Sequence, residues 1–205
     1  MEETAAIILP PPNHKGELSL EQTIFRRQSE RTYADSPLTV TEVSQMIWAA
    51  AGKNIDAVTG PTRTFPSAGG LYPQKFYLVV NNVENLANGI YSYKWKDHAL
   101  EPIKKGEYGQ ELADAALGQR AIARAPLNIV TTAVPERTTQ KYGRRGERYV
   151  MIDAGFSGQN IYLQAESLGL ATVTMGAFSE KELSALLDLD SGEIPLLIMP
   201  VGKKE

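Results

Sequence analysis

A predicted helix over residues 147–168 constrains the fold more than any other segment, because apolar residues such as Ile152 and Ile161 recur on more than one of its faces. A helix of this kind has to be covered on more than one side. It also contains Gly155 and Gly158, and glycine within a helix indicates that another group comes close to the backbone. We therefore expect a central helix that is buried on both sides, with a second subunit as a candidate for one of them.

Strand-like and helix-like segments mix along the chain without a regular βαβ period, which favours an α+β fold over a doubly wound sheet. Runs of β-branched and aromatic residues predict strands over residues 75–80, 90–95, 99–103, 127–134, 170–178 and 194–202. Apolar periodicity predicts further helices over residues 19–28, 41–52, 109–119 and 179–189. A tight turn at Asp97 and His98 separates the second and third strands, so a hairpin is expected in the middle of the chain.

The ends of the first two helices carry recognisable caps. Ser19 with Gln22 three residues later predicts a capping box, and either Thr39 or Thr41 caps the next helix, which Gly52 ends.

Residues 1–16 contain three consecutive prolines and are predicted to form an extended arm, which leaves residues 17–205 as a single domain. Residues 53–73 are rich in glycine and proline. A long irregular stretch of this kind in a compact domain is more often functional than idle.

Composition excludes several functions. Lys and Arg total 21 against 24 Asp and Glu, a net charge of −3, which argues against a nucleic-acid partner. The chain has no cysteine and only two histidines, His14 and His98, both expected at the surface, so we assign no metal. No apolar run is long enough for a membrane span, and no signal-peptide pattern opens the chain, so we expect a cytoplasmic protein without a membrane partner.

Two segments could bind an anionic ligand. The run RRQSERTY, residues 26–33, places Arg27, Ser29 and Arg31 together, and guanidinium groups bind phosphate bidentately. The alternative is a solvated basic helix face. The run PSAGGLYP, residues 66–73, holds two adjacent glycines that let backbone amides approach a flat or anionic ligand, although a tight turn before a strand has the same pattern.

Two further segments end strands. MGAF, residues 175–178, offers backbone N–H groups at a strand end, and Lys203 follows Gly202 after the last strand, where it could meet a phosphate. Each has a plain strand terminus as its alternative. No P-loop and no Rossmann GxGxxG pattern is present.

Taken together, in this order and spacing, these segments resemble the flavin-dependent nitroreductase family, and within it the branch of SagB-type and thiazole-forming oxidases. The resemblance also includes RTTQKYGRRGERY and DAGFSGQNIYLQAESLGL, residues 137–149 and 153–170, and so spans nearly the whole chain. It implies a nitroreductase-like fold: a mainly antiparallel central sheet flanked by helices, with the long central helix at a dimer interface.

The resemblance further implies a homodimer that binds two FMN molecules between its subunits. Arg27, Ser29 and Arg31 would hold the phosphate and ribityl chain, and Lys203 would join the phosphate. The flavin ring would be lined from the other subunit by residues of the glycine-rich segment, namely Pro66, Ser67, Ala68 and Gly70. Gly176, with Ala177, would place a backbone N–H near flavin N5.

Two positions depart from the family pattern. Phe156 stands where many relatives carry histidine, and Met175 stands where an acidic residue often precedes the N5 glycine. Both changes make the ring surroundings less polar, which is expected to affect substrate preference more than FMN binding.

Lys141 and Tyr142 are the candidate catalytic residues, because a similar pair in azoline-oxidising relatives takes part in proton removal. The alternative is a basic loop with Arg144, Arg145 and Arg148 that steers an anionic substrate, with Tyr142 lining the pocket.

The activity implied is an FMN-dependent oxidoreductase that takes electrons from NADH or NADPH and passes them to a small nitro or quinone acceptor by a ping-pong mechanism. Two alternatives remain. The first is an azoline dehydrogenase acting in peptide maturation, and the second is a flavin-binding protein without turnover.

Overall fold

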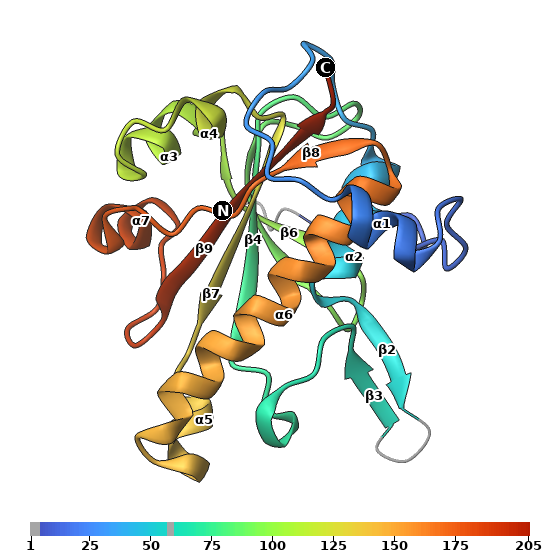
Figure 1. The fold of residues 1–205 in the computed structure, drawn as a ribbon. Helices are drawn as coiled ribbons and strands as arrows, with labels where there is room; N and C mark the ends of the chain where they lie inside the picture. The colour runs from blue at the N-terminus through green and yellow to red at the C-terminus, as the bar shows by residue number, and fades with distance from the viewer. Residues whose placement is uncertain (1–4, 57–59) are drawn as a thin grey trace.

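The computed structural model describes residues 5–56 and 60–205, which form one seven-stranded sheet with helices on both faces and a separate two-stranded hairpin (Figure 1). The strand order is β1-β6-β5-β4-β7-β9-β8, and every neighbouring pair is antiparallel. The strands of this sheet are β1 (Ile7–Ile8), β4 (Gln74–Val80), β5 (Gly89–Lys94), β6 (Ala99–Lys105), β7 (Leu127–Ala133), β8 (Leu170–Thr172) and β9 (Ile194–Lys203). The predicted α+β class with a mainly antiparallel sheet is confirmed.

The hairpin and the helices complete the element list. The hairpin pairs β2 (Lys53–Asp56) with β3 (Gly60–Arg63). The helices are α1 (Leu20–Arg26), α2 (Val40–Ala51), the short 3₁₀ turn η1 (Ala68–Gly70), α3 (Gly109–Ala115), α4 (Arg120–Arg124), α5 (Glu136–Tyr142), α6 (Arg145–Ser167) and α7 (Glu180–Leu186).

Each face of the sheet has its own hydrophobic core. Leu78 and Ile129 face a cluster that includes Ile161 of α6 and Met46 of α2. The next residues along the same two strands face the opposite cluster, which is completed by side chains of α3, α4 and α7. Because successive strand residues point to opposite faces, a sheet buried on both faces needs uninterrupted apolar runs, and this explains the composition of β4 and β7.

The long helix α6 runs diagonally across the sheet (Figure 1). Its buried face packs on the sheet and on α2, and Ser157 Oγ donates to the Ala50 carbonyl at 2.7 Å. Its other face carries Met151, Ile152 and Phe156, which are 45–54% exposed. Within the described chain, nothing approaches within 4 Å of where a Cβ on Gly155 would lie. The sequence-based expectation of a close neighbour at Gly155 is therefore not met by this chain alone.

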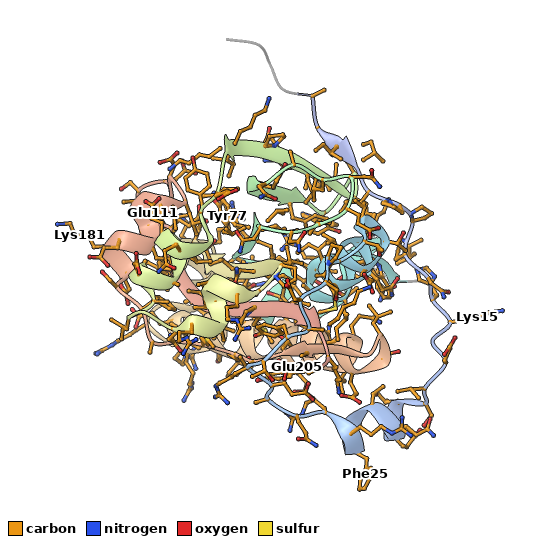
Figure 2. All side chains as sticks on the ribbon, turned by 90° about the horizontal axis from the view of Figure 1, so that it is seen from above. Lys15, Phe25, Tyr77, Glu111, Lys181 and Glu205 are labelled. Carbon is orange, nitrogen blue, oxygen red and sulfur yellow. The ribbon has the colours of Figure 1, made fainter. Side chains whose placement is uncertain are left out.

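Helix α1 stands out from the body of the molecule, as Figure 2 shows by the outward side chain of Phe25. That side chain is 91% exposed, and Leu20 and Ile24 of the same helix are more than half exposed. Helix α1 therefore leaves three apolar side chains in contact with solvent.

The N-terminal arm packs on its own chain. Ile7 and Ile8 pair with β6, and the Pro10 carbonyl accepts hydrogen bonds from Ser44 Oγ and His98 Nε2. His98 also contacts Tyr93 Oη through Nδ1, at 2.7 Å. The expectation that His98 is a plain surface residue is wrong, because its ring joins the arm to the sheet.

Three local predictions are corrected. The predicted helix over 109–119 ends at Ala115, since Leu117 and Gly118 adopt positive φ angles of 61° and 74°, and α4 starts afresh. The irregular stretch 53–73 contains the β2–β3 hairpin. The predicted strand over 170–178 is ordered as β8 only to Thr172, after which a single bridge joins Met175 to Ile198.

The capping box of α2 gives a stability prediction. Thr39 Oγ1 accepts the Glu42 amide at 3.2 Å, and Glu42 Oε2 accepts the Thr39 amide at 2.7 Å, so the cap is Thr39 and not Thr41. Thr39→Ala should lower the free energy of unfolding by about 0.5–2 kcal/mol in urea denaturation. Thr41→Ala, at an exposed position two residues later, is the control and should leave it nearly unchanged. Equal losses in the two variants would contradict this assignment of the cap.

Candidate active site

The loop that carries Ser67 and Ala68 is fixed by a carboxylate of α6. Ser67 Oγ donates to Asp153 Oδ2 at 2.6 Å, and the Ala68 amide donates to Oδ1 at 3.4 Å. Ser67 Oγ also accepts the Tyr72 amide at 2.9 Å. Asp153 is 2% exposed, and its burial raises the pKa of the carboxyl group although the bonds from Ser67 and Ala68 oppose that rise. The hydroxyl of Ser67 is therefore occupied within the chain, which leaves backbone and side-chain carbon atoms of this loop to face a ligand.

The turn η1 lies against the C-terminal end of α5. A Cβ on Gly69 would lie 2.6 Å from Tyr142 Oη and 3.0 Å from Lys141 Nζ, and Gly69 has a φ of 63°. Only glycine fits there without a shift. Lys141 and Tyr142 are the last two residues of helix α5, so they do not lie in a loop as the alternative interpretation has it, and they lie beside the glycine-rich segment.

The basic segment after α1 is extended and runs beside the ends of β8 and β9. The Glu30 amide donates to Thr172 O at 2.9 Å, and the Ala34 amide donates to Lys203 O at 3.0 Å. These bonds bring the segment that contains Arg27, Ser29 and Arg31 to the strand end that contains Lys203. Lys203 Nζ lies 3.7 Å from Glu42 Oε1. Over residues 5–56 and 60–205, no ion pair involves Arg27 or Arg31, so both guanidinium groups can meet an external anion.

Tyr162 of α6 connects this basic segment to the loop after β8. Its hydroxyl lies 2.9 Å from Ser29 Oγ and accepts the Thr174 amide at 2.8 Å, while the guanidinium of Arg27 lies 5.1 Å from the ring centroid. Two residues after Thr174, Gly176 and Ala177 are exposed, and the space beside Gly176 is open. Tyr162 therefore joins the basic segment to Thr174, the residue immediately before the MGAF segment.

The cavities at these residues are shallow. One of about 330 Å³ is bounded by α6, Tyr162, Thr174 and Leu197, and one of about 280 Å³ by Ser67, Ala68 and Phe156 with their neighbours.

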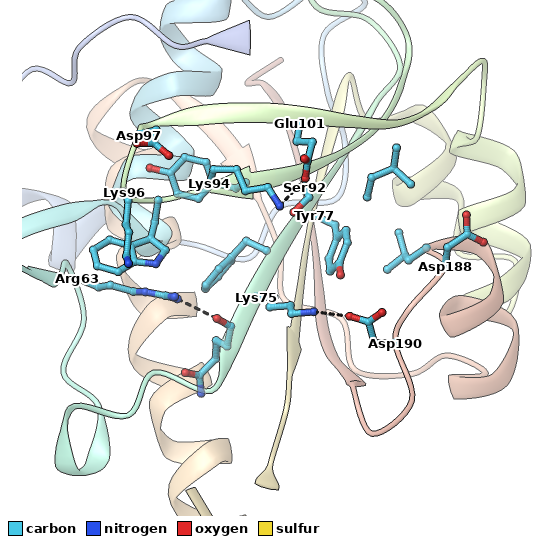
Figure 3. Close-up of a pocket in the computed structure, with 16 residues that line it drawn as sticks. Arg63, Lys75, Tyr77, Ser92, Lys94, Lys96, Asp97, Glu101, Asp188 and Asp190 are labelled. Carbon is cyan, nitrogen blue, oxygen red and sulfur yellow. Dashed lines mark hydrogen bonds and ion pairs between the residues drawn. The ribbon is translucent and has the colours of Figure 1, made fainter. Parts of the chain in front are cut away.

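Larger cavities lie elsewhere. One of about 740 Å³ lies between the arm, α1, α2 and α6. Another, of about 500 Å³, is bounded by Arg63, Trp95 and Lys75, which is paired with Asp190 (Figure 3). None of the site residues expected from the sequence lines either of these larger cavities.

Within residues 5–56 and 60–205, no group of three or more His, Asp or Glu side chains is placed to hold a metal ion. In the same part of the chain, no helix is both long enough and apolar enough to cross a membrane.

Asp153 and Tyr162 were not assigned roles from the sequence, although both lie in the segment that carries the family resemblance. A signal for Asp153 exists, since an acid on the buried side of a long helix needs a partner. Tyr162 gives no such signal, because its two partners are 133 and 12 residues away along the chain.

Comparison with known proteins identifies the family. The sequence profile of the nitroreductase family matches residues 24–203. Over 204 residues the chain is 43% identical to MJ1384 of Methanocaldococcus jannaschii, a protein assigned to the nitroreductases, and the match covers 100% of this chain and 99% of that protein. The chain therefore belongs to the nitroreductase family, which confirms the resemblance to that family.

Two further similarities agree with this assignment. The structure of a Ralstonia eutropha protein assigned to the nitroreductases superposes with a TM-score of 0.84 at 28% identity, covering 100% of this chain and 92% of that one. The Escherichia coli microcin B17-processing protein McbC is 27% identical over 147 residues, which is 68% of this chain and 54% of McbC. Similarity to McbC fits the SagB-like branch.

The buried carboxylate of Asp153 gives a pH prediction. Its folded pKa is raised above the ordinary value of 3.8, so ionisation costs stability as the pH rises from about that value through the folded pKa. Urea denaturation should be carried out on the wild type and on Asp153→Asn across this pH range. The wild-type free energy of unfolding minus that of the variant should fall over this window and become constant above it. Ser67→Ala should raise the folded pKa further and so extend the upper end of this window to higher pH, because the Ser67 bond favours the ionised carboxylate. A difference that does not depend on pH would contradict the burial of this charge.

Proposed function

We propose that the protein is a homodimer that holds FMN between its two copies, reduces it with NADH or NADPH, and passes the electrons to a small nitro or quinone acceptor by a ping-pong mechanism. FMN, when bound, supplies the hydride-transfer chemistry. The contribution of the chain is to bind the cofactor, orient it and cover it.

The described residues fit the two ends of FMN. Arg27 and Arg31 have no ion pair in the described chain, and with Ser29 and Lys203 they offer cations and a hydroxyl donor to the phosphate dianion. Gly176 and Ala177 are exposed, so a backbone N–H there is free to donate to N5. What supports this function most directly is that Tyr162 contacts Arg27 and Ser29 at the phosphate end and also binds the amide of Thr174, two residues before Gly176.

The geometry of α6 supports the sharing of each FMN between two copies. Asp153, which fixes the Ser67 loop, and Tyr162, which contacts Ser29, are nine residues apart, so they point to opposite sides of the helix about 13.5 Å apart along its axis. One copy thus separates the proposed ring-lining residues, Pro66, Ser67, Ala68 and Gly70, from its own phosphate-binding residues. A second copy related by two-fold symmetry would bring the two sets together. The cavity at Pro66, Ser67 and Ala68, of about 280 Å³, agrees with a half-site.

The exposed apolar side chains of α6 are the surface we assign to the dimer. Met151, Ile152 and Phe156 lie beside the open backbone of Gly155. An apolar stripe of this kind on a helix in solvent calls for a partner.

At the other end of the site, Lys141 and Tyr142 lie over Gly69, and Arg144, Arg145 and Arg148 follow in the next turns of chain, all three exposed. We assign this cluster to the attraction of the anionic nicotinamide nucleotide and Tyr142 to the wall of the substrate pocket.

An azoline dehydrogenase is the second candidate function. It is favoured by the similarity to McbC and by the contact of the Lys141–Tyr142 pair with the glycine-rich segment. A further solved structure, of the Escherichia coli microcin synthetase McbBCD with truncated pro-MccB17 bound, shares the fold with a TM-score of 0.73 at 22% identity. In this function Lys141 would remove a proton while FMN accepts hydride, and oxygen would reoxidise the flavin.

The visible absorption spectrum tests the proposal. The purified protein should show flavin bands that bleach when NADH or NADPH is added without oxygen. Bands that persist with both nucleotides would favour the azoline dehydrogenase or a flavin-binding protein without turnover. A protein that shows no bands even after FMN is added would contradict all three functions.

The same assay locates the phosphate site. Arg27→Ala removes a charge-assisted contact and should weaken FMN binding roughly ten- to a hundredfold, equivalent to about 1.5–3 kcal/mol. Arg26→Ala is the matched control, since it removes the same charge from the neighbouring exposed residue. Equal FMN dissociation constants for the two variants would mean that Arg27 is not a phosphate ligand.

The shared site links FMN to the dimer. Removing FMN should raise the dimer dissociation constant in analytical ultracentrifugation, because a ligand that binds only the dimer stabilises it. Phe156→Glu should do so as well, while Leu117→Glu, 71% exposed between α3 and α4, should not. An apo-protein that dimerises as tightly as the FMN complex would remove this link.

A further inference from the structure

We propose that Tyr162 is a positioning residue that couples the phosphate-binding segment to the loop of Gly176 through a continuous chain of hydrogen bonds. This inference rests on the proposed function, since it concerns how the two ends of the FMN site act on each other. Tyr162 contacts Arg27 and Ser29 at the phosphate end. It reaches the loop of Gly176 through the amide of Thr174.

The hydrogen-bonding capacity of the phenol determines how the chain runs. A tyrosine hydroxyl has one proton to donate and can accept at its oxygen. The Thr174 amide can only donate, so at 2.8 Å it uses the acceptor side of Tyr162 Oη. Between Tyr162 Oη and Ser29 Oγ, 2.9 Å apart, either group can be the donor. Without a phosphate, this second hydrogen bond can therefore run in either direction.

Binding of a phosphate selects one of them. Ser29 is exposed, and its hydroxyl proton is needed when Ser29 donates to a phosphate oxygen. Tyr162 must then donate its own proton to Ser29. The chain now runs in one direction, from the Thr174 amide to Tyr162, from Tyr162 to Ser29, and from Ser29 to the phosphate. Hydrogen bonds aligned in this way polarise one another, so each becomes stronger.

Charge around the phenol supports the same direction. Burial alone would raise the pKa of Tyr162, but bonds donated by Ser29 and Thr174, with the nearby Arg27 guanidinium, leave that pKa below its ordinary value. The Arg27 cation acts whichever way the Ser29 bond runs, and it makes the phenol hydroxyl a better donor to Ser29. Arg27 over the ring face also holds the aromatic group and the cation in one place.

The effect reaches Gly176 because the residues between Tyr162's partner Thr174 and Gly176 are held by hydrogen bonds. Met175, which follows Thr174, is held to Ile198 by two backbone bonds of 2.9 Å, one in each direction. With Thr174 fixed by Tyr162 and Met175 fixed by β9, the direction of the next amide, that of Gly176, is set. A phosphate bound at Ser29 therefore tightens the loop that would face the flavin ring.

Tyr162→Phe tests this inference, because it keeps the ring under Arg27 and removes only the hydroxyl. We expect FMN binding to weaken roughly 3- to 30-fold, and riboflavin, which lacks the phosphate, to be affected much less, so that the preference for FMN falls. The midpoint potential of bound FMN should also shift. Tyr91→Phe is the matched control. The Tyr91 hydroxyl donates a hydrogen bond of 2.6 Å to the Ala87 carbonyl, which belongs to neither of these segments.

A double-mutant cycle with Ser29→Ala measures the coupling. If the two hydroxyls belong to one chain of hydrogen bonds, their effects on FMN affinity are not independent. The product of the fold-losses of Ser29→Ala and Tyr162→Phe should then exceed the fold-loss of the double variant. Should Tyr162→Phe fold poorly, Ser29→Ala alone tests the coupling, because it changes an exposed residue and should still shift the midpoint potential of bound FMN.

The outcomes separate the inference from the function on which it rests. A Tyr162→Phe protein that matches Tyr91→Phe in FMN affinity, FMN preference and midpoint potential, while the wild type binds FMN, overturns the inference alone. Independent losses in the double-mutant cycle do the same. A wild type that binds no FMN contradicts the proposed function and the inference together.

Discussion

The packing of α6 against the sheet is the contact on which the rest of the molecule depends. Its buried side chains close the core between α2 and the strands, and Ser157 ties it to the end of α2. From the same helix, Asp153 holds the glycine-rich loop and Tyr162 holds the basic segment. A shift of α6 along its axis would therefore disturb the core and both candidate half-sites at once. This explains why a helix that contains three glycines is continuous over 23 residues: tertiary packing supplies most of its stability.

Charge in this protein is arranged locally. The net charge of −3 says little about the site, because the cations that matter are those without acidic partners. Arg27 and Arg31 have no ion pair in the described chain, whereas Lys75 is held by Asp190 and by the buried Glu193. The pairs of Lys75 with Asp190 and Glu193 fasten the loop before β9 to the sheet. The charge of Lys75 is therefore not available to an external anion. Arg27 and Arg31 are thus the strongest candidates for an anion, whereas Lys203 would share its charge between the anion and Glu42, 3.7 Å away.

The sequence predicts well what depends on neighbouring residues and less well what depends on distant ones. The capping boxes of α1 and α2 and the strands β4, β5 and β7 follow from short patterns, and they are found where expected. The break between α3 and α4 is missed because Leu117 adopts a positive φ that its residue type does not suggest. Helix α5 is missed because its position depends on contact with α6: a Cβ on Gly146 would lie 2.9 Å from the backbone of Thr138 and Thr139. Likewise, Asp153 and Tyr162 gain their roles from partners that no local pattern reveals.

The two edge strands of the sheet have a consequence for how copies of this protein can meet. On one side the edge is β1, only two residues long, which covers part of β6, and on the other it is β8, which has three residues. Short edges present few unpaired backbone groups, and this discourages strand addition between molecules. The N-terminal arm, held at Pro10 by Ser44 and His98, thus covers β6 at Ala99 and Leu100 and shortens the edge that another molecule could extend. Removal of the arm would leave the whole seven-residue edge of β6 unpaired and make strand addition, and with it aggregation, easier.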